Sequence, residues 1–153
     1  MNILSTQYSI NNKAFEIYLA GCSGIPKCVG CHNPESWCFR QGNNYIDEMD
    51  KIMDKIIQFS DMIDNIFILG GEPLDQDRND LLGMLTTINT LNKSMWLFTR
   101  YELIDIDCDI KNQFDYIKTG RYDKSLECGD NIYFGVKLAS SNQKIIKTNR
   151  NRY

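Results

Sequence analysis

Two short apolar runs separated by a helical pattern constrain the fold of this chain more than any other feature. Residues 65–69 (NIFIL) and 95–99 (MWLFT) are almost wholly apolar, as is typical of parallel strands with helices on both faces. Between them, leucine and isoleucine recur at helical spacing from Leu81 to Leu91. This order of strand, helix and strand predicts a βαβ unit and therefore a parallel sheet.

The rest of the chain extends this α/β pattern. An amphipathic helical stripe runs from Ile46 to Ile57, and a shorter helix-like piece lies near 101–106. Further strands are predicted at 14–20, 114–118, 132–136 and 144–147. The chain has 153 residues, too few for a complete (β/α)8 barrel of about 250 residues. We expect a single domain, 1–153, with a polar tail at about 148–153 whose last five residues are frayed.

Charge and hydrophobicity exclude several classes of protein. Lys and Arg number 17 against 20 Asp and Glu, and the net charge of −3 argues against direct binding of nucleic acid. No apolar run approaches the roughly 20 residues that span a bilayer, and residues 1–10 do not resemble a secretion signal. We therefore expect a cytoplasmic protein without membrane partners. Six cysteines in a reducing compartment favour metal binding or catalysis over disulfides.

Three of these cysteines lie close together in a loop. Cys22, Cys28 and Cys31 are spaced C-x5-C-x2-C at the start of segment 22–38, the cysteine loop, whose glycines and prolines prevent regular structure. A zinc site would need a fourth ligand, such as His32 or Cys38. A 4Fe-4S cluster held by only three cysteines keeps one iron open for a substrate or cofactor. The spacing of the cysteines alone is compatible with either a zinc site or a 4Fe-4S cluster.

Three segments that carry candidate site residues follow predicted strands. The cysteine loop follows 14–20, the glycine-rich segment 70–73 follows 65–69, and Thr99 ends the next strand. Parallel strands place their carboxyl ends at one edge of a sheet, where ligands bind in α/β proteins. The sequence therefore predicts that these segments meet at one site.

The order of several motifs resembles a known family. The stretch 21–37 (GCSGIPKCVGCHNPESW) looks like the cluster loop of radical S-adenosylmethionine (radical SAM) enzymes, particularly the activases of glycyl radical enzymes. GGEPL at 70–74, WLFTRY at 96–101, FDYIKTGRY at 114–122 and SSNQ at 140–143 are similar to further segments of such activases. The likeness covers most of residues 14–147 and implies an incomplete (β/α) barrel of the radical SAM type with a mainly parallel sheet.

The resemblance also implies a reaction. Cys22, Cys28 and Cys31 would hold a 4Fe-4S cluster whose open iron binds S-adenosylmethionine. Reductive cleavage would yield a 5′-deoxyadenosyl radical that removes a hydrogen atom from a glycine of a partner enzyme. The implied partner is a glycyl radical enzyme such as an anaerobic ribonucleotide reductase, and a small protein such as a flavodoxin would donate the electron.

Seven further residues are expected to bind the cofactors. Gly70 and Gly71 would let the backbone approach the methionine moiety, and Glu72 could accept hydrogen bonds from its ammonium group. Thr99 and Lys118, at predicted strand ends, suit the carboxylate or ribose oxygens. His32 and Asn33 follow the third cysteine as in the family, and His32 could stack on adenine, bond a sulfur or cap the loop.

The chain departs from the family at two places and leaves two other functions open. The segment before the first predicted strand lacks the glycines and arginines that such activases often have there. Five residues separate Cys22 from Cys28 where three are usual, and the two additions contribute at most about 7 Å of chain. One alternative is a radical SAM enzyme acting on another peptide or on a metabolite. The other is a non-catalytic interaction module that binds zinc or a cluster.

Overall fold

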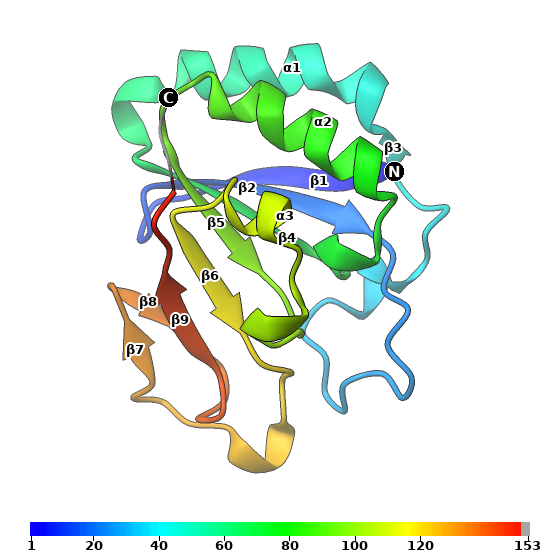
Figure 1. Ribbon diagram of the computed structural model, residues 1–153, viewed down its shortest axis with the longest axis vertical. Coiled ribbons are helices and arrows are strands. Elements are labelled where there is room, and N and C mark those ends of the chain that lie inside the picture. The colour runs from blue at the N-terminus through cyan, green and yellow to red at the C-terminus, as the bar shows by residue number, and fades with distance from the viewer. Residues whose placement is uncertain (151–153) are drawn as a thin grey trace.

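The predicted parallel strands form the centre of a seven-stranded sheet in the computed structural model, which describes residues 1–150 (Figure 1). Four neighbouring strands run parallel: β2 (Ala14–Ala20), β4 (Asn65–Gly70), β5 (Ser94–Phe98) and β6 (Tyr116–Thr119). Each of the first three lies within a residue or two of its prediction, whereas β6 begins two residues later than expected. The βαβ interpretation of the sequence is therefore confirmed.

Both edges of the sheet are antiparallel, so the sheet is parallel only at its centre. β1 (Asn2–Ser9), which the sequence analysis did not predict, pairs with β2 and with the short β3 (Asn43–Asn44). β9 (Lys144–Lys147) pairs with β6 at the other edge. The strand order is β3-β1-β2-β4-β5-β6-β9, and β3 and β9 are not paired with each other. The described residues thus form a mixed α/β fold with an open sheet.

Two amphipathic helices cover one face of this sheet. α1 (Tyr45–Gln58) begins where the Asn44 side chain accepts a hydrogen bond from the Ile46 N–H at 3.0 Å. α2 (Arg78–Asn89) begins at Asp77, whose carboxylate accepts hydrogen bonds from two N–H groups of the first turn. These side chains satisfy donors that a helix start leaves unpaired. α1 and α2 lie side by side on the sheet, as Figure 1 shows.

The two faces of the sheet pack against different parts of the chain. Ile66, Ile68 and Leu97 belong to the core beneath the helices. The alternate residues Phe67 and Trp96 belong to a second cluster, which is completed by residues near the C-terminus: Val136, Leu138 and Ile145. Helices were expected on both faces, and that expectation is wrong. A strand covered by irregular segments has the same apolar sequence as a strand covered by helices, because either cover buries the side chains on that face.

The last third contains short, irregular elements. The helix-like piece near 101–106 is a 3-10 turn (Leu103–Asp105) followed by the one-turn α3 (Cys108–Lys111). The run 132–136 forms a hairpin rather than one strand, because β7 (Ile132–Tyr133) and β8 (Val136–Lys137) meet at Gly135, which has φ of +81°. Glycine adopts this φ without steric cost.

Thr148 and Arg150, at the start of the polar tail, are hydrogen-bonded to Asp115. The Thr148 N–H donates to the Asp115 carbonyl at 2.9 Å, and the Arg150 guanidinium pairs with the Asp115 carboxylate at 2.8 Å. Residues 151–153 of the predicted tail lie outside the described residues. The polar composition of this segment indicates exposure to solvent. It gives no sign of the ion pair between Arg150 and Asp115, which lie 35 residues apart in sequence.

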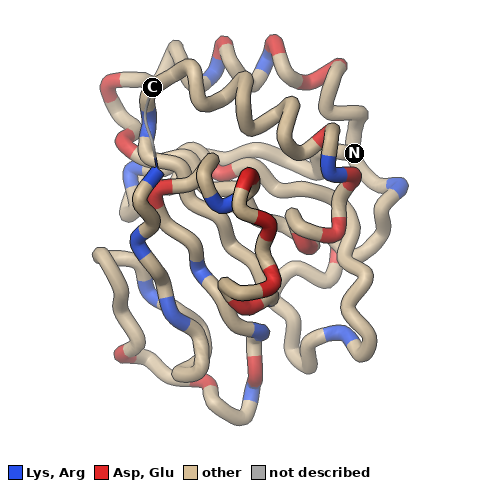
Figure 2. Tube along the Cα trace, in the orientation of Figure 1, with Lys and Arg blue, Asp and Glu red and all other residues tan. Residues whose placement is uncertain are grey.

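Charged side chains are unevenly distributed over the fold. Figure 2 shows basic residues along β8 and β9, which hold Lys137, Lys144 and Lys147. Acidic residues gather in segment 102–109 (Figure 2). Within residues 1–150, no helix combines the length and apolar composition needed to cross a bilayer.

The buried face of α1 provides a test of this arrangement. Ile56 is 1% exposed and its neighbour Ile57 is 58% exposed. We expect Ile56→Ala to lower the free energy of unfolding by about 2–5 kcal/mol, because it removes buried methylene groups and leaves a cavity. Ile57→Ala, the matched control, should change it by no more than about 0.5 kcal/mol. Chemical denaturation of both variants measures the difference, and equal effects would contradict the assigned helix face.

Candidate functional site

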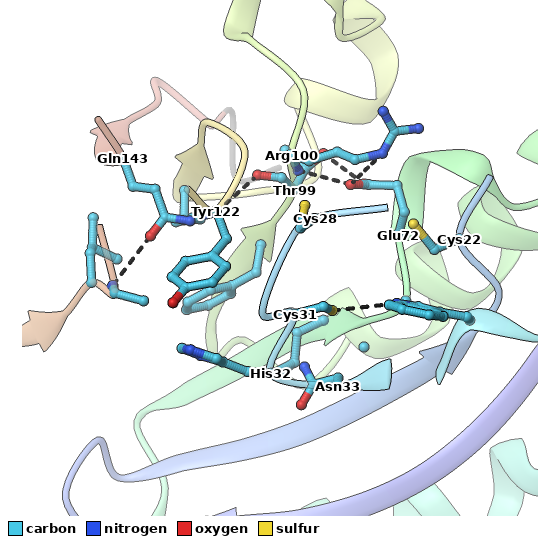
Figure 3. Close-up of a pocket in the computed structure, with 18 of the residues that line it drawn as sticks. Cys22, Cys28, Cys31, His32, Asn33, Glu72, Thr99, Arg100, Tyr122 and Gln143 are labelled. Carbon is cyan, nitrogen blue, oxygen red and sulfur yellow. Dashed lines mark hydrogen bonds and ion pairs between the residues drawn. The ribbon is translucent and has the colours of Figure 1, made fainter. Parts of the chain in front are cut away.

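One cavity at the carboxyl ends of the parallel strands collects the candidate residues. All ten residues assigned from the sequence line it: Cys22, Cys28, Cys31, His32, Asn33, Gly70, Gly71, Glu72, Thr99 and Lys118. The cavity has a volume of about 250 Å³. Figure 3 shows the cysteines on the loop after β2, opposite side chains that follow β5 and β6. We call this space the site cavity.

The cysteine loop is anchored where β2 and β4 end. The Gly71 N–H donates to the Leu19 carbonyl at 2.9 Å, and the Glu72 N–H donates to the Gly21 carbonyl at 2.8 Å. The Gly21 N–H in turn donates to the Ser36 carbonyl at 2.7 Å. A Cβ at residue 71 would lie 2.2 Å from the Gly21 oxygen. Glycine is therefore required at residue 71 by this close approach of backbones, whether or not a ligand is bound.

Glu72 links the ends of β4 and β5 from a buried position. Its carboxylate accepts hydrogen bonds from the Thr99 hydroxyl at 2.6 Å, the Arg100 N–H at 2.8 Å and the Leu74 N–H at 3.1 Å. Burial raises the pKa of Glu72 above its ordinary value, and these hydrogen bonds oppose the rise. A carboxylate has about four acceptor positions. Three of these positions accept hydrogen bonds from the fold, and Arg100 Nε lies 3.8 Å from Oε2, so the carboxylate is held mainly by its own protein.

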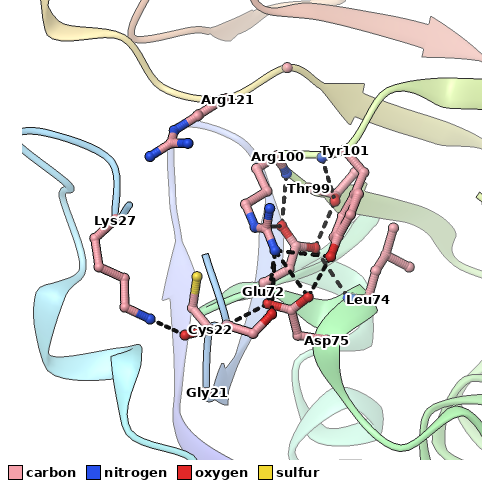
Figure 4. Close-up of polar contacts among 12 residues, drawn as sticks. Gly21, Cys22, Lys27, Glu72, Leu74, Asp75, Thr99, Arg100, Tyr101 and Arg121 are labelled. Carbon is pink, nitrogen blue, oxygen red and sulfur yellow. Dashed lines mark hydrogen bonds and ion pairs between the residues drawn. The ribbon is translucent and has the colours of Figure 1, made fainter. Parts of the chain in front are cut away.

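A second polar network fixes the beginning of the cysteine loop (Figure 4). Asp75 accepts hydrogen bonds from the Ser23 N–H at 2.6 Å, the Tyr101 hydroxyl at 2.7 Å and Arg100 Nη2 at 3.2 Å. Burial favours a higher pKa for Asp75, but the hydrogen bonds from Tyr101, Ser23 and Arg100 together hold the pKa below its ordinary value. Sequence analysis assigned no role to Asp75 because its partners come from distant segments.

Two predicted residues meet on the opposite wall. Lys118 Nζ donates to the Gly120 carbonyl at 2.7 Å and to the Thr99 carbonyl at 3.3 Å. Burial lowers the pKa of Lys118 to about 8, and the negative charge of Glu72 opposes the shift. An ammonium group has three donors. Lys118 thus keeps one donor for a ligand in the cavity.

The C-terminal segment supplies a wall that sequence reasoning missed. Gln143 accepts hydrogen bonds from the Ala139 and Ser140 N–H groups and donates to the Gly120 carbonyl. Tyr122 contacts His32, with ring centroids 4.6 Å apart. The cavity lining that was not assigned consists of Trp37, Leu69, Phe98, Arg100, Tyr122, Lys137, Leu138, Ala139 and Gln143. The motifs at 114–122 and 140–143 contained a signal for this wall, although no individual residue was assigned from them beyond Lys118.

The three thiols face a shared space without meeting at one point. Among residues 1–150, no three His, Cys, Asp or Glu side chains lie close enough to share one metal ion. A structural zinc site requires such convergence, with ligand atoms about 2.0–2.3 Å from a single ion. In an iron-sulfur cluster each cysteine sulfur binds its own iron, so the sulfurs need only surround a common volume.

The donor set fits such a cluster chemically. All six cysteines are free, and Cys22, Cys28 and Cys31 are partly buried in the cavity wall. Thiolates are the soft ligands that iron-sulfur clusters require. The cavity also offers apolar surface from Leu69, Phe98 and Leu138. Its lining thus combines thiols, polar groups and apolar surface, the kinds of contact that a cluster and an organic ligand with polar and apolar parts would make.

Comparison with known proteins defines the class. A family described as "4Fe-4S single cluster domain" matches residues 13–146, so the chain belongs to this family. Among curated proteins, it is similar to the anaerobic ribonucleoside-triphosphate reductase-activating protein of Enterobacteria phage T4, with 28% identity over 118 residues, covering 72% of this chain and 71% of the relative. The protein of the same name from Vibrio cholerae is 28% identical over 110 residues, or 66% of each chain. These relatives confirm the resemblance to activases that the motifs indicated.

The raised pKa of Glu72 predicts a pH dependence of stability. Because the folded chain binds this proton more tightly than the unfolded chain, the contribution of Glu72 is fully present below the ordinary pKa of 4.5 and is lost as pH rises through the higher folded value. Compared with Glu72→Gln, the wild type should therefore gain stability as pH falls from about 8 to about 4.5. Unfolding by denaturant at several pH values measures this difference.

Glu48 on α1 provides the control for this experiment. A hydrogen bond from Lys51 lowers the pKa of Glu48, so its contribution is lost only as pH falls below 4.5. The stability difference between wild type and Glu48→Gln should stay constant over the higher range. A constant difference for Glu72→Gln as well would show that the carboxylate titrates normally.

Proposed function

We infer that this chain is a radical SAM activase that installs a glycyl radical in an anaerobic ribonucleotide reductase. The observation that carries the inference is the site cavity, which brings three cysteines of one loop together with the residues at three strand ends, in a chain of the 4Fe-4S family. The names of the relatives support the activating role and the partner. The open sheet, with its cavity at the carboxyl ends of parallel strands, supports an incomplete barrel of the radical SAM type.

The roles of the residues follow from their positions. Cys22, Cys28 and Cys31 would hold a 4Fe-4S cluster and leave one iron for S-adenosylmethionine. When bound and reduced by a donor such as a flavodoxin, these groups supply a 5′-deoxyadenosyl radical that takes a hydrogen atom from a glycine of the partner. The remaining tasks belong to this chain: it would bind and orient the reacting groups and exclude water from them.

Glu72 and Lys118 would bind the polar groups of S-adenosylmethionine. The negative charge of Glu72 suits the ammonium group of this ligand, and the remaining donor of Lys118 suits the carboxylate or ribose oxygens. Thr99 is occupied by Glu72 and by the Tyr101 N–H, which it accepts at 3.1 Å. Because its single proton is donated to Glu72, Thr99 would orient Glu72 and has no donor left for the carboxylate or ribose oxygens of the ligand. Gly70, Asn33 and His32 complete the lining around this space.

Replacement of one proposed ligand tests the cluster. After anaerobic reconstitution with iron and sulfide, Cys28→Ala should lose iron, visible absorbance and the release of methionine and 5′-deoxyadenosine from S-adenosylmethionine, because two thiolates cannot retain the cluster. Cys108→Ala, which removes an exposed cysteine on α3, should behave like the wild type. Full cleavage by the Cys28 variant would rule out the assigned ligand.

The partner is tested separately from the cleavage. Mixed with its cognate reductase, S-adenosylmethionine and a reductant, the reconstituted protein should produce a glycyl radical signal in electron paramagnetic resonance, and the Cys28→Ala variant should produce none. If cleavage proceeds but the reductase acquires no signal, the activase role is wrong while the cofactor assignment stands. A radical SAM enzyme acting on another substrate would then replace it.

A further inference from the structure

We propose that Trp37 is a positioning residue that raises the reduction potential of the cluster through a hydrogen bond from its indole N–H to the Cys31 sulfur. The inference rests on the proposed function, because it requires Cys31 to be a cluster ligand. Trp37 Nε1 lies 3.4 Å from Cys31 Sγ, and Figure 3 shows the bond on the wall of the site cavity. Trp37 itself lines this cavity.

The acceptor changes when the sulfur binds iron. A free thiol is a weak acceptor, whereas a bound thiolate carries negative charge and accepts a shorter, stronger hydrogen bond. Reduction adds one more negative charge to the cluster and its ligands. A donor fixed at the sulfur therefore stabilises the reduced state more than the oxidised state, and such bonds are a recognised means by which proteins set cluster potentials.

The backbone around Trp37 fixes the direction of its indole. Trp37 ends the 3-10 helix Pro34–Trp37, and its carbonyl accepts a hydrogen bond from the Cys22 N–H at 3.2 Å. The preceding residue, Ser36, is fully buried, and its hydroxyl donates to the Asn33 carbonyl at 2.6 Å. Trp37 thus contacts the first proposed ligand through its backbone and the third through its side chain. The donor is held in place before any cluster arrives.

Lys27 strengthens this donor. Its Nζ lies 5.6 Å from the centroid of the Trp37 ring and also donates a hydrogen bond to the Cys22 carbonyl. A cation over an aromatic face draws electron density from the ring, which makes the indole N–H a better donor. Lys27 belongs to the five residues between Cys22 and Cys28, the segment that is two residues longer than is usual in the resembled family. Lys27 thus places a positive charge that acts on Cys31 through Trp37.

The second tryptophan of the chain provides a matched control. Trp96 Nε1 donates to Asn65 Oδ1 at 2.9 Å, and its ring stacks on Tyr116 on the sheet face opposite α1 and α2. It does not line the site cavity. Trp37→Phe and Trp96→Phe make the same chemical change, but only the first removes a donor from a proposed ligand.

The test is the midpoint potential of the reconstituted full chain. Each variant is titrated with dithionite under anaerobic conditions while the signal of the reduced cluster is followed by electron paramagnetic resonance. Relative to wild type, we expect Trp37→Phe to shift the potential to a more negative value at unchanged iron content, by up to a tenfold change in the reduction equilibrium, or about 59 mV for one electron. Trp96→Phe should leave the potential unchanged. Lys27→Met should shift it in the same direction as Trp37→Phe, and by less when Trp37 is already Phe.

The outcomes separate this inference from the proposed function. Equal potentials for wild type and Trp37→Phe would overturn the role of Trp37 and leave the function standing. If Trp37→Phe fails to hold a cluster, replacement of Trp37 by 3-benzothienylalanine keeps the shape of the indole without its N–H, and the same negative shift is then required. Failure of the wild type to take up any cluster would overturn both proposals.

Discussion

The site depends on the close approach of three backbone segments at the ends of β2 and β4. Hydrogen bonds join Gly71 to Leu19, Glu72 to Gly21 and Gly21 to Ser36, and no space remains for a side chain at residue 71. Buried backbone groups must be paired, so these bonds fix the path of the chain on both sides of the cysteine loop. The first residues of the loop and its closing 3-10 helix are thereby tied to the sheet, while the three thiols between them face the cavity.

The buried carboxylates mainly stabilise this arrangement of the backbone. Glu72 and Asp75 accept most of their hydrogen bonds from other parts of the fold, and Arg100 contacts both carboxylates. Charges of this kind are tolerated inside a protein only when they are paired or fully hydrogen-bonded. The groups that the fold leaves for a ligand are consequently few: one donor on Lys118, the thiols and the negative charge of Glu72.

The sequence predicted the parts of this structure that leave a local pattern. The spacing of Cys22, Cys28 and Cys31 marked the loop, and the runs ending at Gly70 and Thr99 marked the two strands beside it. Patterns in the chain could not show that irregular segments, rather than helices, cover the second face, because either cover buries the same apolar side chains. Asp75 was not assigned because its partners lie far away in sequence. Gln143 stood in the motif at 140–143 without a role, because its partner Gly120 lies 23 residues earlier.

The wall of the cavity that the C-terminal segment forms is synthesised long after the cysteines. The thiols occupy residues 22–31, whereas Leu138 and Gln143, which close the opposite side, are added to the nascent chain about 100 residues later. At translation rates of about 5–20 residues per second, the cysteines wait several seconds or more for the cavity to be complete. During this interval the thiols lack the cover that Leu138 and Gln143 give them in the folded protein. The cover over the cysteines is therefore among the last parts of the fold to be made.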